Sequence, residues 1–279
     1  MPPETLYGLV LAAAVAHATW NALLKSSSDP LLMMASIRAV GLLFGLSLLP
    51  FVPFPKAEVW PWLLACAAAH YAYYALLLRC YRHGDMSLVY PLARGSAPLL
   101  LAGLSFLAID ERLGPGQIAA VALTSSGIML LACGKGRNGL ATLFAAATAL
   151  SIAGYSFLGG VGVRLEGDVW AFQVYLEMLT SVPILAVAAM KRGKAVALFA
   201  SAHWGKGLFA GIISTGGYFT YQLAVTVLPL APVAALRESS AIFGAIIGTV
   251  IFKEGFGALR LVAAALVTTG IVLLGFLSF

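Results

Sequence analysis

Ten apolar stretches of about 20 residues follow one another along the chain, and their connections are short except for a longer loop from Met190 to Gly207. They cover residues 5–24, 30–50, 59–79, 86–107, 114–133, 139–162, 169–189, 207–227, 231–252 and 257–278. A helix needs about 20 predominantly apolar residues to cross a bilayer. Long Ala- and Leu-rich runs without alternation are not typical of membrane strands. Only 10% of the 279 residues are charged, against about 25% in soluble domains. We therefore predict an all-α, multi-pass integral membrane protein with ten transmembrane helices.

The basic residues are distributed unequally between the two sides that ten crossings define. The side that carries both termini holds Lys56, Arg112 and Arg164. The opposite side holds Lys25, Arg79, Arg82, Lys135, Arg137, Lys191, Arg192, Lys194, Lys206 and Lys253. Cytoplasmic loops of membrane proteins are enriched in Lys and Arg. The pattern thus predicts an inner (plasma) membrane protein with both termini outside. In this interpretation the basic residues behind the net charge of +6 orient the chain in the membrane, and no nucleic-acid partner is expected.

The second half of the chain repeats the first. With an offset of 143 residues the halves align without a gap from Arg94 to Leu131. Four polar or glycine matches carry this alignment: Arg94 with Arg237, Ser96 with Ser239, Glu111 with Glu254, and Gly127 with Gly270. Nearer the start of each half, an offset of 139 pairs Asp29 with Asp168 and Arg38 with Glu177, and an offset of 147 pairs Tyr71 with Tyr218 and Tyr74 with Tyr221.

Each half contains five predicted crossings, so the second copy enters the membrane inverted relative to the first. We expect one membrane domain built from two repeats, residues 1–135 and 136–279, around a central cavity. Inverted repeats recur in secondary transporters, where the substrate site lies near the bilayer midplane between the repeats.

The chain resembles the drug/metabolite transporter superfamily, in its EamA-type ten-helix branch. The resemblance lies in the two five-helix halves, the segment YPLARGSAPLL, the helix end Asp110-Glu111-Arg112-Leu113, and its echo Lys253-Glu254. It implies a cavity between crossings 1–4 and 6–9, supported by crossings 5 and 10. Members of this group export amino acids and other small metabolites, and the aromatic amino-acid exporters form one subgroup.

Five ionisable residues fall inside the predicted membrane core. They are Arg38, Arg94, Glu177, Arg237 and Glu238. Inserting one charged residue at the centre of a membrane helix costs about 3 kcal/mol. Each of the five is therefore expected either to form a structural ion pair or to take part in function. Three cations against two anions leave one positive charge, which could receive a substrate carboxylate.

Polar and aromatic side chains recur on single faces of several predicted helices. Their spacing of three or four residues places them together, and such faces do not favour lipid. The alternative interpretation is helix packing. Adding the two arginines, we predict a substrate-binding set composed of His17, Trp20, Asn21, Tyr71, Tyr74, Tyr218, Tyr221, Gln222, Arg94 and Arg237.

The chain lacks the motifs of several other functions. It contains no G-x-x-x-x-G-K-[ST] motif for ATP-driven transport and no metal-ligand spacing, so we expect neither cofactor nor metal and no enzymatic activity. The predicted function is secondary transport by alternating access, exporting amino acids that include aromatic or large neutral ones. Two alternatives stay open: a multidrug exporter of lipophilic cations, and an integral-membrane enzyme. The expected partners are a small-molecule substrate and membrane lipid, with the chain acting as a monomer.

Overall fold

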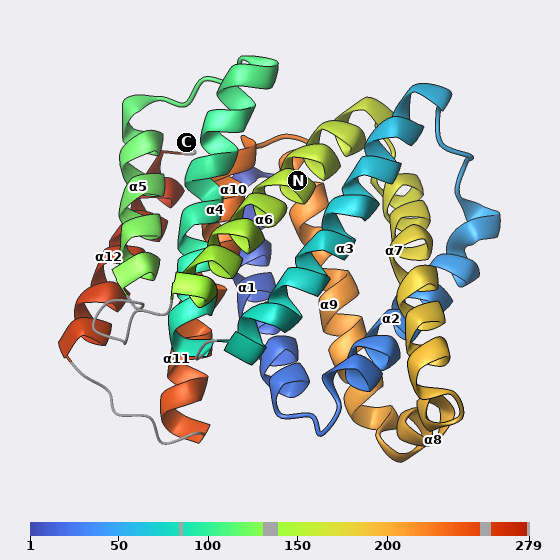
Figure 1. The fold of residues 1–279 in the computed structure, drawn as a ribbon. Coiled ribbons are helices and arrows are strands. Elements are labelled where there is room, and N and C mark those ends of the chain that lie inside the picture. Colours follow the sequence, from blue (N-terminus) through green and yellow to red (C-terminus); the bar gives the residue numbers. More distant parts are fainter. Residues whose placement is uncertain (84–85, 131–138, 252–257, 278–279) are drawn as a thin grey trace.

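The computed structural model describes residues 1–83, 86–130, 139–251 and 258–277, and these residues form helices and short connections without a strand. Figure 1 shows the helices packed around a central region. In chain order they are α1 (Pro3–Lys25), α2 (Pro30–Leu48), η1 (Leu49–Phe51), η2 (Ala57–Val59), α3 (Trp60–His83), α4 (Met86–Ile109), α5 (Pro115–Leu130), α6 (Gly139–Glu166), α7 (Val169–Arg192), α8 (Ala195–Ala202), α9 (Trp204–Val225), α10 (Leu230–Glu238), α11 (Ser240–Ile251) and α12 (Ala258–Phe276).

Every apolar stretch predicted from the sequence is occupied by helix. In the described part of the chain, five helical segments are long and apolar enough to cross a membrane, and α8 with α9 make a sixth if this bent pair is one crossing. The protein is therefore a multi-pass membrane protein, and the count of ten crossings stays a prediction.

Two details of the predicted layout are wrong. The stretch 231–252 was expected to be one continuous helix, but the structure ends α10 at Glu238 and begins α11 at Ser240. The connection between α7 and α9 was expected to be a loop, but it contains α8, which bends 87° from α9. The break at Ser239 falls in a short polar run, Arg237-Glu238-Ser239-Ser240, and α8 is an apolar segment between the basic residues Lys194 and Lys206. Neither composition by itself decides between a helix and a break in a helix.

Two aspartates start equivalent helices in the two halves. Asp29 accepts hydrogen bonds from the amides of Leu31 and Leu32 at the start of α2. Asp168 accepts from the amides of Trp170 and Ala171 at the start of α7. An N-cap carboxylate satisfies amides that have no partner within the helix, which explains why aspartate stands at both positions.

Glycine allows the two outermost helices to touch at their backbones. A Cβ on Gly127 of α5 would lie 2.9 Å from the carbonyl oxygen of Ala263 on α12. A Cβ on Gly270 of α12 would lie 2.8 Å from the carbonyl oxygen of Ala120 on α5. Each repeat-related glycine therefore receives the backbone of the other half, as small residues do at close helix contacts in membranes.

The remaining contacts surround the centre of the molecule. Helix α3 packs on α6, α1 packs on α9, α2 packs on α7, and α4 contacts α10 (Figure 1). Each of these pairs joins a helix of the first half to one of the second. The centre of the fold is therefore walled by both halves.

Candidate substrate cavity

A small cavity lies at mid-depth between the two halves. Its volume is about 50 Å³, and its walls come from α1, α2, α3, α6, α7, α9 and α10. Its lining residues are Ala13, His17, Trp20, Arg38, His70, Tyr73, Tyr74, Tyr155, Leu176, Glu177, Thr180, Ser214, Gly217, Tyr218 and Arg237. Among the described residues, α4, α5 and α12 contribute none. The resemblance implied this for the fifth and tenth crossings, but it had placed the fourth crossing at the cavity.

Half of the residues predicted for the substrate site line this cavity. They are His17, Trp20, Tyr74, Tyr218 and Arg237. Two others lie directly behind the wall. Arg94 contacts His17 Nε2 and donates to the Tyr73 hydroxyl, and the Tyr221 ring lies 4.2 Å from the guanidinium carbon of Arg237.

The other three predicted residues are not among those that line the cavity. The hydroxyl of Tyr71 donates to the Leu179 carbonyl on α7, so Tyr71 serves helix packing. Asn21 donates to the carbonyl of His17, one turn earlier in its own helix. Gln222 is fully buried in α9, away from the cavity lining. Helical spacing placed these side chains near residues that line the cavity. Only some of the residues on each such helix face reach the cavity itself.

Several lining residues were missing from the predicted site. Arg38 and Glu177 had been recognised as buried charges without being placed in the cavity, whereas His70, Tyr73, Tyr155, Thr180 and Ser214 had not been selected. His70 precedes Tyr74 by four residues, so the same helical spacing that linked other candidates could have included it.

Arg38 and Glu177 form a buried ion pair between α2 and α7. Arg38 Nη1 lies 3.0 Å from Glu177 Oε2, and both side chains are only 5% exposed. Arg38 Nη2 donates to Ser214 Oγ on α9, and Gln173 Nε2 donates to Glu177 Oε1. Arg38, Glu177 and Ser214 also line the cavity. The charges of Arg38 and Glu177 therefore balance each other, and the pair presents polar atoms to the cavity.

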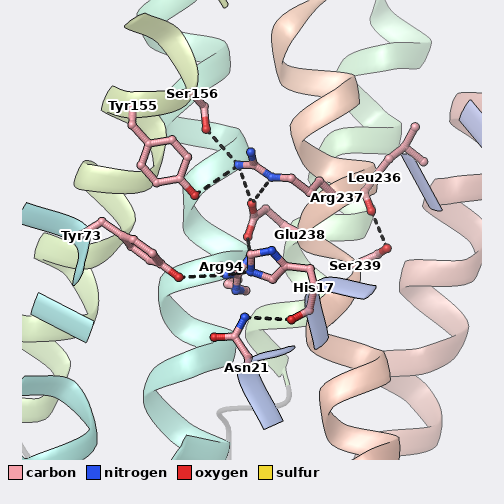
Figure 2. Close-up of polar contacts among 10 residues, drawn as sticks. All are labelled: His17, Asn21, Tyr73, Arg94, Tyr155, Ser156, Leu236, Arg237, Glu238 and Ser239. Carbon is pink, nitrogen blue, oxygen red and sulfur yellow. Dashed lines mark hydrogen bonds and ion pairs between the residues drawn. The ribbon is translucent and has the colours of Figure 1, made fainter. Parts of the chain in front are cut away.

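A second buried network joins two arginines to one carboxylate (Figure 2). Arg94 Nη1 lies 2.5 Å from Glu238 Oε2. Arg237 donates to Glu238 Oε1 from Nε at 3.0 Å and from Nη2 at 2.9 Å. All three side chains are at most 4% exposed. With arginine always protonated, two cations in this network share the one carboxylate of Glu238.

The surroundings of Arg237 fix its position at the cavity wall. Its Nη2 also donates to Ser156 Oγ at 3.0 Å and approaches the Tyr155 hydroxyl at 3.5 Å (Figure 2). The rings of Tyr155, Tyr218 and Tyr221 lie within 6.0 Å of its guanidinium carbon, a cation–π arrangement. Among the described residues, Nη1 has no hydrogen-bond partner, so its two N–H groups remain available for a ligand.

His70 faces the cavity from within an aromatic cluster. Its ring stacks on Tyr155 at 4.2 Å and meets the edge of Tyr218 at 5.1 Å. His70 Nδ1 lies 2.9 Å from the Cys66 carbonyl oxygen. Since a carbonyl only accepts, Nδ1 carries the proton, and Nε2 of a neutral ring is an acceptor. The cavity therefore combines cationic donors, an imidazole acceptor and aromatic rings.

Glu111, at the end of α4, joins the two halves at the side of the termini. Because Glu111 and Glu254 stand just beyond their predicted crossings, the sequence predicts that each accepts hydrogen bonds from the N-terminal amides of the next helix in the chain. Glu111 instead accepts from the Leu230 amide that begins α10 and from Arg164 Nη1, each at 2.9 Å. It caps a helix of the opposite half, and Glu254 lies outside the described residues.

Comparison with known proteins supports a transporter of this kind. The model of the EamA-like transporter family matches residues 139–276, which comprise the second half of the chain. The second half of the chain is thus similar to a family of membrane transporters. No curated protein matches the sequence.

A solved structure described only as "Crystal structure of protein" shares the fold, with a TM-score of 0.73 and 17% identity. The alignment covers 99% of this chain and 97% of that one. At this level of identity the likeness concerns the fold alone, but it extends over both halves of the chain.

Proposed function

We propose that the protein is a secondary transporter that exports amino acids, including aromatic or large neutral ones, by alternating access. The observation that carries this proposal is the mid-depth cavity in which Arg237, a cation with free N–H groups, stands beside aromatic walls. The family match over residues 139–276 supports transport of small molecules. The residues of the cavity support the narrower substrate class.

The architecture supports an inverted repeat. Equivalent aspartates cap α2 and α7, and the equivalent Gly127 and Gly270 meet where α5 packs on α12. The contact of α3 with α6 has its counterpart in the contact of α9 with α1. Such correspondences are those of two copies related by a pseudo-two-fold axis, with residues 1–135 as one copy and 136–279 as the other. Rocking of one repeat against the other is the usual basis of alternating access.

The charge balance favours a substrate that bears a carboxylate. Arg38, Arg94 and Arg237 face Glu177 and Glu238 across the two networks. Burial of an unbalanced charge is unfavourable, so an anionic group in the cavity would stabilise the site. Arg237 Nη1 is the donor we assign to this carboxylate. His70 Nε2 is then an acceptor for the substrate ammonium.

The aromatic rings provide surface for a flat side chain. Trp20, Tyr74, Tyr155 and Tyr218 contribute rings to the cavity wall. Offset stacking contributes about 0.5–1.5 kcal/mol per pair beyond burial of area. An indole or phenyl side chain would therefore gain from contacts that a small aliphatic side chain does not make.

Binding requires the helices to separate from their present positions. A cavity of about 50 Å³ has room for a few water molecules, which is less than an aromatic amino acid needs. Pro91 and Pro98 lie inside α4, and Pro183 lies inside α7. Prolines interrupt the backbone hydrogen bonds of a helix and permit bending. We assign the opening movements to these helices.

The alternative of a lipophilic-cation exporter is less well supported. Recognition of an organic cation favours a carboxylate that is not already neutralised. Glu177 is paired with Arg38, and Glu238 is held by Arg94 and Arg237. The likeness to a transporter family favours transport over an enzymatic role, and we propose that the chain is not an enzyme.

Flux measurements in proteoliposomes test the proposal. The substrates are tryptophan, alanine, tryptamine and a lipophilic cation, compared at equal gradients. We expect transport of tryptophan in preference to alanine, and little transport of tryptamine because it lacks the carboxylate. Preferential transport of the cation or of tryptamine would favour the alternative, and absence of flux for every substrate would contradict the proposed substrate class.

A further inference from the structure

The end of α7, helix α8 and the start of α9 form an elbow, residues 190–206, at the end of the molecule opposite the termini (Figure 1). Helix α7 ends at Arg192 and is followed by Gly193, whose φ of 53° is a backbone conformation that favours glycine. Helix α8 follows at 87° to α9. If α9 crosses the membrane, α8 lies close to the plane of the membrane surface.

The elbow is held in place by contacts with α2. Arg192 Nε lies 2.7 Å from Asp29 Oδ2 at the start of that helix. Phe199 of α8 packs against a buried cluster that includes Trp20, Met33 and Ile37. The elbow is therefore a fixed part of the fold and presents a defined outer surface.

That outer surface combines large apolar side chains with lysines. Met190, Leu198 and Trp204 are 86%, 69% and 70% exposed. Lys191 and Lys194 precede α8, Lys206 follows it, and all three are exposed. Within the described ranges, none of the three lysines forms an ion pair, whereas Arg192 is already engaged by Asp29.

We propose that the elbow is a binding site for anionic phospholipid headgroups. Lys191, Lys194 and Lys206 contact lipid phosphates, and Leu198 and Trp204 enter the boundary between headgroups and acyl chains. An apolar segment that lies in the interface binds through buried apolar area and through attraction to anionic lipid. The predicted orientation places the elbow at the cytoplasmic leaflet, where anionic lipid is concentrated. This inference concerns lipid and does not depend on the identity of the transported substrate.

The test compares wild-type protein in nanodiscs of phosphatidylcholine alone with nanodiscs that also contain phosphatidylglycerol. We expect phosphatidylglycerol to raise the melting temperature, by about 2–4 °C for each lysine that is engaged, and salt to reduce the shift. The triple variant K191Q/K194Q/K206Q should lose most of the shift. The charge-preserving variant K191R/K194R/K206R should keep it, and so should R112Q, which removes an exposed charge near the opposite end.

Three outcomes would overturn the proposal. One is an equal melting temperature in the two lipid compositions for the wild-type protein. Another is an undiminished shift in the triple glutamine variant. The third is reproduction of the shift in neutral nanodiscs by inorganic phosphate at the same concentration, which would indicate a site for free anions. If the triple variant does not fold, native mass spectrometry of the single variants K191Q, K194Q and K206Q replaces it. Each single variant must retain fewer phosphatidylglycerol molecules than wild type. Unchanged retention in all three contradicts the proposal.

Discussion

Arg94 and Arg237, which occupy equivalent positions in the two halves, hold opposite oxygens of one carboxylate, that of Glu238. The repeat is not symmetric at the following position, because Gly95 stands where the second half has Glu238. A Cβ at Gly95 would lie 2.9 Å from the Ser125 carbonyl oxygen. The first half therefore has no space for a glutamate of its own, and one carboxylate serves both arginines.

This arrangement predicts that Glu238 is indispensable for folding. The substitution Glu238→Gln removes the carboxylate that both buried arginines contact, and breaking a buried ion pair typically costs about 3–5 kcal/mol. Thermal unfolding in detergent should show a large loss of stability or failure to fold. Glu58→Gln, on an exposed side chain, is the matched control. A stability of Glu238→Gln equal to that of the control would contradict the assigned role.

The aromatic residues of α3 predict a contrast between two neighbours. Tyr74 lines the cavity, while Tyr71 donates to the Leu179 carbonyl on α7. Tyr74→Ala should weaken tryptophan binding by about fivefold, equivalent to about 1 kcal/mol of lost stacking. Tyr71→Phe should lower stability slightly and leave affinity unchanged. The measurement is the KM for tryptophan in proteoliposomes, and equal KM values for the two variants would exclude Tyr74 from the site.

The cap at Asp29 predicts a dependence of stability on pH. Burial raises the pKa of this carboxyl group, but hydrogen bonds from Arg192 and from the amides of Leu32 and Leu31 outweigh burial and hold the pKa below its ordinary value. A depressed pKa in the folded state gives stability that is present above the unfolded value of about 3.9 and is lost as pH falls through the folded value.

The wild-type protein should therefore have a higher melting temperature than Asp29→Asn near neutral pH, and the difference should shrink below about pH 4. Unfolding curves of both proteins between pH 3 and pH 7 give this difference directly. A difference that stays constant over the whole range would show that ionisation of Asp29 does not contribute.

The distribution of basic residues predicts that the elbow faces the cytoplasm. In a background without cysteine, single cysteines at Ser201 and near Pro2 are labelled in intact cells with an impermeant maleimide. The cysteine near Pro2 should react, and the cysteine at position 201 should react only after the cells are permeabilised. The reverse pattern would invert the predicted topology.

The sequence was sufficient to predict the helices and much of their correspondence. Aspartate favours the start of a helix, and glycine permits close helix contact, whatever the rest of the fold. A match of such residues between the two halves therefore indicated equivalent positions, as at Asp29 with Asp168 and Gly127 with Gly270. The ends and breaks of helices were less predictable, because α8 occupies a segment flanked by basic residues, and the break at Ser239 falls in a polar run whose residue types also occur inside continuous helices.

The site was only partly predictable for a different physical reason. Spacing of three or four residues identifies which side chains share a helix face, but it does not identify which face turns inward. On α3, both Tyr71 and His70 share such spacing with Tyr74, and only His70 lines the cavity with it. The ion pair of Arg38 with Glu177 joins residues 139 positions apart, so it follows from the packing of α2 on α7 and not from local sequence.

The central claim, that Arg237 binds the substrate carboxylate, is tested most directly by the KM for tryptophan in Arg237→Gln and Arg237→Lys. Removal of Arg237 leaves Arg94 paired with Glu238, so both variants should fold, which their melting temperatures verify. Loss of a hydrogen bond to a charged group predicts a KM raised by about tenfold or more in the glutamine variant, with a smaller increase in the lysine variant. A folded Arg237→Gln protein that transports tryptophan with the wild-type KM would contradict the claim.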